Sequence, residues 1–353
     1  MTSGLLSRPP EEGARLLALS FLDQAAAARP RLAAEPVDAE ALHDFRVGLR
    51  RLRSCLRAYR AYLEESVPKK LARKLRRLAR STGPGRDMEV QVEWLRGCRT
   101  HLSSYHRAGL AWLLARLEER LREAYAKMSA EVDRDFTEIE KELRARLSVY
   151  RTEVHLDAAA HLSTLGETTA GILHDQVGEL EIHLARLEEP GDEKAAHRAR
   201  ISAKRVRYLL EPFAEELPQA GAVVKRFKTL QDLLGDLHDA HVLEHEIAEA
   251  TEAAAAERAG KLLEISLAEV PDEKLLRAEQ RRARESGLIA LARLNRARRD
   301  RLFEALEAEW LEDKAGDFLR EVESLADPMA RATSPQPSPE GEGELNPSKA
   351  PLL

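Results

Sequence analysis

The chain has 353 residues, 43% of them apolar, 33% charged and only 5% aromatic, a composition that excludes an all-β fold and favours one large domain, or two modest ones, built from long packed helices. The formal net charge of −5 conceals two basic islands, because residues 43–86 carry +11 and residues 194–207 carry +6, which leaves −22 for the remainder. Two cysteines, Cys55 and Cys98, exclude a disulfide framework, and without an export signal or a run of about 18 apolar residues we expect a cytoplasmic protein.

The first part of the chain is predicted to be helical after a disordered start at residues 1–9. Residues 13–34 form an amphipathic pattern, and residues 105–150 form one very long helical pattern or two stacked ones. Between them, an apolar stripe that should face a core recurs at helical spacing: Phe45, Leu49, Leu52, Leu56 and Tyr59. One position further, about 100° round the helix, lies a cationic stripe with His43 at its N-terminal end: Arg46, Arg50, Arg53, Arg57 and Arg60.

The second part of the chain is predicted to follow the same plan. Residues 157–187 form an amphipathic helix, and residues 243–269 and 273–325 form closing helices that are broken near Pro271. Between them, an apolar stripe is again expected to face the core: Ala199, Ala203, Val206, Leu210 and Phe213. The cationic stripe beside it consists of His197, Arg200, Lys204 and Arg207. Residues 327–353 are rich in Pro, Ser, Gly and Glu and are expected to form a disordered tail.

These similarities amount to an internal repeat. Residues 43–53 read HDFRVGLRRLR and residues 197–207 read HRARISAKRVR, with basic or His positions aligned at an offset of 154. An aspartate precedes each segment, Asp38 and Asp192, and is predicted to cap the helix that follows. Further on, at an offset of 152, three cations recur and are followed by Gly83 and Asp87 in one copy and by Gly235 and Asp239 in the other. We interpret each glycine as a helix end and each aspartate as the next N-cap rather than as a ligand.

The doubled pattern H-x-x-R-[VI]-x-x-[RK]-R-x-R, followed each time by a G-x-x-x-D junction, resembles the CHAD family, the conserved-histidine α-helical domains. The resemblance covers residues 10–326. It implies an all-α domain of two pseudo-symmetric four-helix halves, about 10–150 and 157–326, with a basic groove or cavity where they meet. It also implies binding of inorganic polyphosphate and an association with polyphosphate granules. The chain departs from the pattern at Gly85, Met88 and His238, outside the cationic stripes.

The residues expected to bind polyphosphate are the two motif histidines, the cations present in both copies, and three arginines of the first copy alone. They are His43, Arg46, Arg50, Arg51, Arg53, Arg57, Arg73, Lys74, Arg76, Arg77, Arg80, His197, Arg200, Lys204, Arg205, Arg207, Lys225, Arg226 and Lys228. Guanidinium groups are planar bidentate donors to phosphate oxygens, and a helical stripe repeats about every 5.4 Å. If the histidines contact the ligand rather than the core, binding should be tighter at about pH 6 than at about pH 8.

Three alternatives stay open. A nucleic-acid backbone binder would also need basic helices, but the islands lack interleaved aromatic residues for base stacking. A phosphohydrolase would need clustered carboxylates, which the islands lack, and His238, Asp239 and His241 form only a weak metal signal. A structural scaffold explains the apolar stripes but not the doubled cations. We therefore expect a non-catalytic protein without a cofactor or metal, whose partners are polyphosphate and proteins of polyphosphate metabolism, with no membrane contact.

Overall fold

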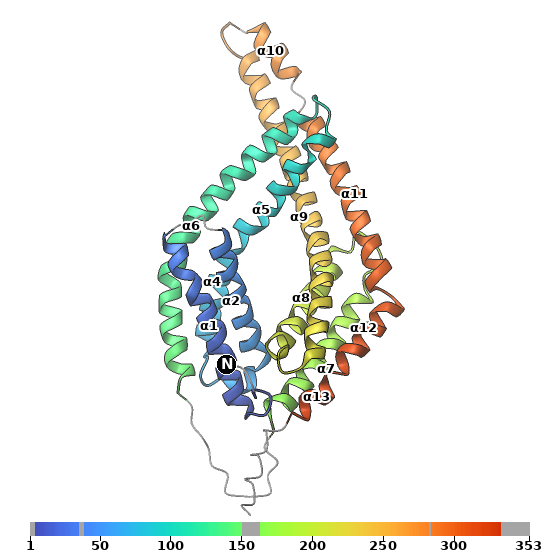
Figure 1. Ribbon diagram of the computed structural model, residues 1–353. Helices are drawn as coiled ribbons and strands as arrows, with labels where there is room; N and C mark the ends of the chain where they lie inside the picture. Colours follow the sequence, from blue (N-terminus) through green and yellow to red (C-terminus); the bar gives the residue numbers. More distant parts are fainter. Residues whose placement is uncertain (1–3, 35–38, 150–162, 271, 282–283, 333–353) are drawn as a thin grey trace, which may run out of the picture.

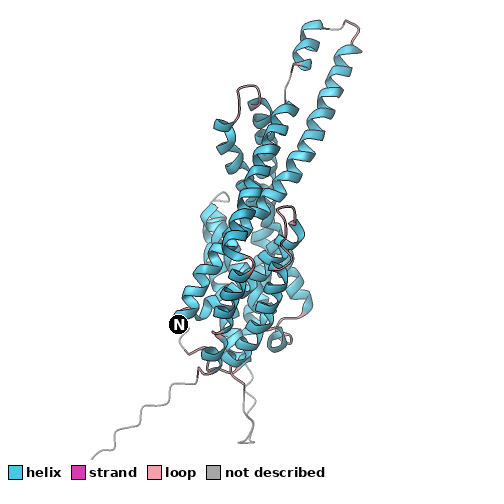
Figure 2. Cartoon of the chain, turned by 90° about the vertical axis from the view of Figure 1, so that its right-hand side faces the viewer, coloured by secondary structure: helices cyan, strands magenta, loops and turns pink. Residues whose placement is uncertain are grey.

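The computed structural model describes residues 4–34, 39–149, 163–270, 272–281 and 284–332. Every regular element within these ranges is a helix, as Figure 2 shows, so the predicted all-α class is confirmed. No helix in the described part of the chain combines the length and the apolar character needed to cross a bilayer.

The first half contains six helical elements before one very long helix (Figure 1). They are α1 (Pro10–Ala34), α2 (Ala39–Ala58), α3 (Arg60–Leu63), α4 (Lys69–Ser81), α5 (Gly83–Gly97), η1 (Cys98–His101) and α6 (Arg107–Leu147). The α6 segment is a single helix of 41 residues rather than two stacked ones. Gly48 lets α1 and α2 approach closely, because a Cβ there would lie 2.7 Å from the backbone nitrogen of Ala25.

The second half is built on the longest helix of the described residues, α9. Its elements are α7 (Leu165–Leu184), α8 (Glu193–Leu210), η2 (Glu211–Phe213), α9 (Pro218–Ser266), α10 (Glu273–Gln280), α11 (Arg284–Trp310), α12 (Asp313–Glu323) and α13 (Ala326–Ala330). The distal end of α9 and α10 project beyond the other helices in both views (Figures 1 and 2). The predicted closing helices at 243–269 and 273–325 correspond to the end of α9, which begins well before residue 243, and to α10, α11 and α12.

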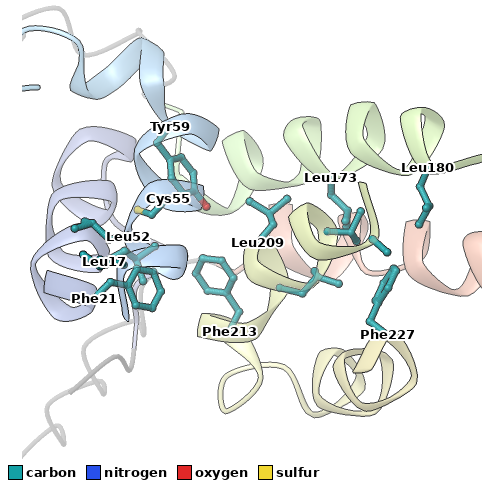
Figure 3. Packing of buried hydrophobic residues seen from close by; sticks show 14 of the residues in the cluster. Leu17, Phe21, Leu52, Cys55, Tyr59, Leu173, Leu180, Leu209, Phe213 and Phe227 are labelled. Atoms are coloured by element: carbon teal, nitrogen blue, oxygen red, sulfur yellow. The ribbon is translucent and has the colours of Figure 1, made fainter. Parts of the chain in front are cut away.

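One apolar core joins the two halves. Phe45 on α2 meets Phe136 on α6 edge to face, with ring centroids 5.0 Å apart. Figure 3 shows Leu209 and Phe213 lying between Leu52 on the first-half side and Leu173 on α7. Both predicted apolar stripes are buried apart from Leu56, which is half-buried. A second, smaller cluster in the described residues also combines the two halves, through Leu95, Leu113 and Leu243, and the pseudo-symmetry of the halves stays a prediction.

Both ends of the described chain fold further than predicted. Leu5 and Leu6 are buried, the Leu5 N–H donates to Glu216 Oε1 at 3.0 Å, and the Leu6 carbonyl accepts from the Gly166 N–H at 2.8 Å. At the other end, Met329 on α13 is fully buried and α13 packs on α7. The predicted disorder is thus wrong for residues 4–9 and 327–332, because the few apolar side chains of these segments pack against the apolar core that contains residues of both halves. Residues 1–3 and 333–353 lie outside the described residues.

The predicted glycine–aspartate junctions are also corrected. Gly83 starts α5 rather than ending α4, and Asp87 lies inside α5. Gly235 and Asp239 both lie in the interior of the unbroken α9. The two copies differ because Pro84 has no N–H to continue a helix, whereas α9 keeps buried residues at core spacing across Gly235, whose presence costs about 1 kcal/mol.

The predicted N-caps have different outcomes. Asp192 does occupy the N-cap position of α8, but its carboxylate accepts hydrogen bonds from the N–H groups of Glu188 and Glu189, each at 2.9 Å, rather than from the helix. It therefore fixes the turn before α8. Asp38 lies outside the described residues.

Candidate functional site

A cavity of about 1010 Å³ lies where α2, α3 and α4 face α8. Its lining is strongly cationic, and Glu64 is the one acidic residue among the described residues that line it. The ten cationic side chains are Arg50, Arg53, Arg57, Arg60, Lys69, Arg73, Arg76, Arg80, Lys204 and Arg205. Figure 1 places α2 beside α8 at the centre of the molecule, and the two helices are in contact, so the cavity draws on both halves.

Helical periodicity explains how α2 and α4 deliver these cations. On α2, Leu49 and Leu52 are buried, and the arginine after each lines the cavity. On α4, Leu71, Leu75 and Leu78 are buried, while the cavity receives a parallel row of Arg73, Arg76 and Arg80. The apolar anchors therefore fix the helices in positions where two rows of guanidinium groups line the same space.

Burial and repulsion between neighbouring arginines both act on this lining. Burial, followed by the nearby Arg76 and Arg80, lowers the pKa of Arg53. Burial, followed by Arg205, also lowers the pKa of Arg57, with a smaller opposing effect from Glu179. Within the described residues, Arg53, Arg57 and Arg76 make no ion pair. Their positive charge is therefore available to an anion that enters the cavity.

The α8 wall is formed by Lys204, Arg205 and Tyr208. The guanidinium groups of Arg50 and Arg207 lie over the Tyr208 ring, at 5.8 and 4.7 Å from its centroid. Arg205 donates to Glu179 on α7 at 2.6 Å and is partly neutralised. Burial, then Arg200 and Arg50, lowers the pKa of Lys204 to about 7. The motif helices of both copies thus contribute to one wall.

A second group of charges surrounds Arg200, next to the cavity. Burial is the main cause of a lowered pKa for Arg200, which Asp239 on α9 and then Asp87 on α5 oppose. The rings of His197 and His238 lie 5.0 Å apart. Burial, followed by Arg200, lowers the pKa of His238 to about 4, and burial followed by Arg200 also lowers that of His197. Both aspartates thus balance interior arginines rather than capping helices.

Arg46 on α2 belongs to the same group. Its pKa is lowered chiefly by burial, and Asp87 exerts the largest opposing effect. Burial is also the main influence on Asp239, where it raises the pKa of the carboxyl, and the nearby Arg200 opposes that rise. Among the described residues, no ion pair joins Arg46 or Arg200 to Asp87 or Asp239, so these charges offset one another at longer range.

The structure divides the predicted site residues into three groups. Lining the cavity are Arg50, Arg53, Arg57, Arg73, Arg76, Arg80, Lys204 and Arg205. Near the interior charges are Arg46, His197, Arg200 and Arg207. Away from both are His43, Arg51, Lys74, Arg77, Lys225, Arg226 and Lys228. Eight of the expected residues are therefore brought together.

Most of the third group serves packing between helices. Arg51 binds Glu211 at 2.6 Å, Lys74 binds Glu138 at 2.5 Å, and Arg77 binds Asp135 at 3.3 Å. Arg226 pairs with Glu321 and lies 4.4 Å from the centroid of the Phe318 ring. His43, Lys225 and Lys228 are exposed.

Sequence reasoning left two cavity residues out of the site. Arg60 lies on α3 and continues the arginine spacing of α2, so its place in the stripe was the available signal. Lys69 begins α4 one turn before Arg73, a spacing that predicts the same helix face. No group of three or more His, Cys, Asp and Glu side chains in the described ranges is arranged to hold a metal ion.

Comparison with known proteins gives a family and a fold. The model of the CHAD domain matches residues 17–248. The crystal structure of the CHAD domain from the plant Ricinus communis is similar, with a TM-score of 0.55 and 22% identity, over 80% of this chain and 93% of that one. PptA from Streptomyces chartreusis is similar with a TM-score of 0.52 and 17% identity, over 86% of this chain and 99% of that one. These identities show a shared fold alone. No curated protein sequence matches the chain significantly.

Proposed function

Since this chain belongs to the CHAD family, we propose that it binds inorganic polyphosphate in the cationic cavity and does so without catalysis. The observation that carries the proposal is a lining in which the described residues supply ten cations and one carboxylate, that of Glu64. So many like charges around one space are compensated best by a polyanion.

The arrangement of the cationic side chains in rows suits a linear chain of phosphates. Rows of arginines on α2 and α4 repeat once per helical turn, about 5.4 Å, so successive guanidinium groups can reach successive phosphates. Each guanidinium offers two parallel donors to phosphate oxygens, which gives orientation as well as affinity. Lys69 and Lys204 add mobile point charges to the two walls.

The aromatic residues of the cavity argue against a nucleic acid as the ligand. Phe21, Tyr59 and Tyr208 line it but are 8%, 2% and 6% exposed. The Tyr208 ring is further covered by two arginines. Base stacking needs an accessible aromatic face. The cavity therefore favours a polyanion without bases.

The absence of catalysis is supported by the chemistry of the lining. Metal-assisted phosphoryl transfer needs carboxylates to hold the ions, and only Glu64 among the described lining residues has one. Arginine and lysine can hold phosphates and stabilise charge. Binding is the activity that these groups supply together.

A titration with long-chain polyphosphate at two ionic strengths tests the proposal. Between about 50 mM and about 200 mM salt, the logarithm of the binding constant should fall linearly with the logarithm of the salt concentration, with a slope of about −0.7 for each phosphate that the protein neutralises. Tripolyphosphate should bind more weakly because it reaches fewer arginines, and single-stranded DNA should be displaced by polyphosphate. Phosphate release should stay at the level without protein. Failure to bind long chains, or tighter binding of DNA, would contradict the proposed function, and released phosphate would contradict the absence of catalysis.

The granule association is a further part of the proposal. A fluorescent fusion of the chain should concentrate on polyphosphate granules in cells that make them. The same fusion carrying Arg53→Glu and Arg76→Glu should lose that localisation, because both arginines line the cavity. Equal localisation of both fusions would contradict it.

A further inference from the structure

Of the two lysines that line the cavity, Lys69 and Lys204, Lys204 has more cationic neighbours. On α8, Arg200 lies one turn before it and Arg207 almost one turn after it, and Arg50 faces it from α2. From α9, Asp239 is the acidic group that faces it. From α7, the neutral Gln176 lines the same cavity, and Glu179 is engaged by Arg205. Within the described residues the Lys204 amine has no hydrogen-bond or ion-pair partner.

This arrangement singles out Lys204 among the cations that surround it. Arginine keeps its proton at every physiological pH, so Arg50, Arg200 and Arg207 cannot relieve their mutual repulsion by losing charge. A lysine can, because its amine releases a proton to water. Burial and the two nearest arginines bring the pKa of Lys204 to about 7, whereas an unperturbed lysine has a pKa of about 10.4. In the empty cavity, Lys204 is therefore the group that loses its proton and its positive charge.

We propose that Lys204 is the proton-coupled contact of the cavity: its amine is uncharged in much of the empty protein near neutral pH and takes up one proton when a polyanion enters. This inference rests on the proposed function, since a phosphate chain is the ligand that restores the charge. The proton comes from the solvent and adds to the Nζ lone pair, and the ammonium then donates to a phosphate oxygen.

The sign of the pH dependence follows from linkage. Bound phosphates raise the pKa of Lys204 above its value in the empty protein, so the complex holds more protons than its separate components. Well below the pKa of about 7 the amine is charged in both states and affinity is insensitive to this group. As the pH rises above that value, affinity falls by up to a factor of about ten per pH unit. His197 and His238 have lowered pKa values and are already uncharged in that range in the empty protein.

Calorimetric titration with long-chain polyphosphate in two buffers of different ionisation enthalpy measures the coupled protons. At about pH 7.5 the wild type should take up about 0.8 proton per bound protein. Lys204→Arg, which keeps the charge but cannot titrate, should take up almost none. Lys141→Arg on α6, where the lysine is exposed and lies outside the cavity, is the matched control and should retain the uptake of the wild type. From about pH 7 to about pH 8.5, affinity should fall about tenfold for the wild type and stay nearly constant for Lys204→Arg.

A second measurement needs no ligand and no variant. Acetylation of the free protein at a series of pH values, followed by peptide mass spectrometry, reports the uncharged fraction of each lysine, and exposed Lys225 is the reference. The labelling of Lys204 should reach half of its maximum near pH 7, well below the pKa of about 10.4 of an unperturbed lysine. Bound polyphosphate should protect Lys204.

The outcomes separate the two proposals. Polyphosphate binding without proton uptake in the wild type, or with the same uptake in Lys204→Arg, overturns the inference and leaves the proposed function standing. No binding of polyphosphate overturns the proposed function, and the labelling profile then decides the state of Lys204 alone. A profile equal to that of Lys225 overturns the inference in either case.

Discussion

The two faces of α4 carry the same kind of side chain in opposite surroundings. On one face Arg73, Arg76 and Arg80 line the cavity beside the arginines of α2. On the other, Lys74 and Arg77 meet Glu138 and Asp135 of α6. The comparison shows that the role of a cation here depends on whether a neighbouring helix supplies a carboxylate.

The largest expected effect comes from reversing charge on the cavity face. Arg53→Glu with Arg76→Glu should weaken polyphosphate binding by about a hundredfold or more, since each lost charged hydrogen bond is worth about 1.5–3 kcal/mol. The salt slope should become shallower as well. Isothermal titration at two salt concentrations measures both effects.

The matched control reverses the charge on the other face of α4. Lys74→Glu with Arg77→Glu changes the net charge by the same amount but removes only side chains that already have acidic partners. Its affinity should fall by less than about tenfold at moderate salt, where charges beyond about 10 Å are screened. Equal losses in the two double variants would show that net charge, rather than the cavity, governs binding.

A smaller effect is expected on stability. Because the unpaired arginines of the cavity repel one another in the empty protein, polyphosphate should raise the thermal midpoint. A ligand at about one hundred times its dissociation constant contributes about 2.7 kcal/mol, which is a rise of several degrees for a chain of this size. Differential scanning calorimetry measures it. The cavity double variant should show little rise, and a rise equal to that of the wild type would contradict the placement of the ligand.

The smallest effect is expected on the outer face of α4. The hydrogen bond between Lys74 and Glu138 raises the pKa of Lys74 and lowers that of Glu138. Glu138→Gln should lower the pKa of Lys74, as NMR titration of its side chain would detect, and should leave polyphosphate affinity unchanged. An unaltered Lys74 titration in that variant would mean that the pair does not persist in solution.

The pH range of this pair follows from the same two shifts. The stability that the pair contributes is lost at low pH, as pH falls through the lowered pKa of Glu138 and its carboxylate is protonated. It is also lost at high pH, as pH rises through the raised pKa of Lys74 and its ammonium loses its proton. Between these limits the pair is intact. Thermal midpoints of the wild type and Glu138→Gln should therefore be nearly equal throughout, because exposed ion pairs contribute little to stability.

Local periodicity predicted the parts of the fold that depend on neighbouring residues in the chain. The apolar stripe through Phe45 and the stripe through Ala199 both face the core, and the arginine that follows each leucine of α2 reaches the cavity. A helix junction near Gly83 was predicted and lies at Thr82, one residue earlier, whereas the unbroken α9 at Gly235 was not predicted. Gly235 alone cannot show whether a helix stops, since the outcome depends on the core contacts on either side of it.

Long-range contacts decided the rest of the candidate site. Arg76 and Arg77 are adjacent in sequence, yet one lines the cavity and the other binds Asp135, which lies 58 residues away in the chain. The terminal segments gave no periodic signal because they are too short to show one. The N-terminal segment is held by hydrogen bonds to α7 and to Glu216, and α13 packs on α7.

The amino-acid sequence by itself determined the helical class, the apolar and cationic faces of the motif helices, and the repeated motif that indicates the family. These features are set by the identity and spacing of residues within a few helical turns. Only the tertiary structure decided which cations stay unpaired, that Arg50 and Lys204 share one cavity, and that Lys204 has a pKa of about 7. Electrostatic energy depends on distances between charges and on their burial, and packing sets both after the helices have formed.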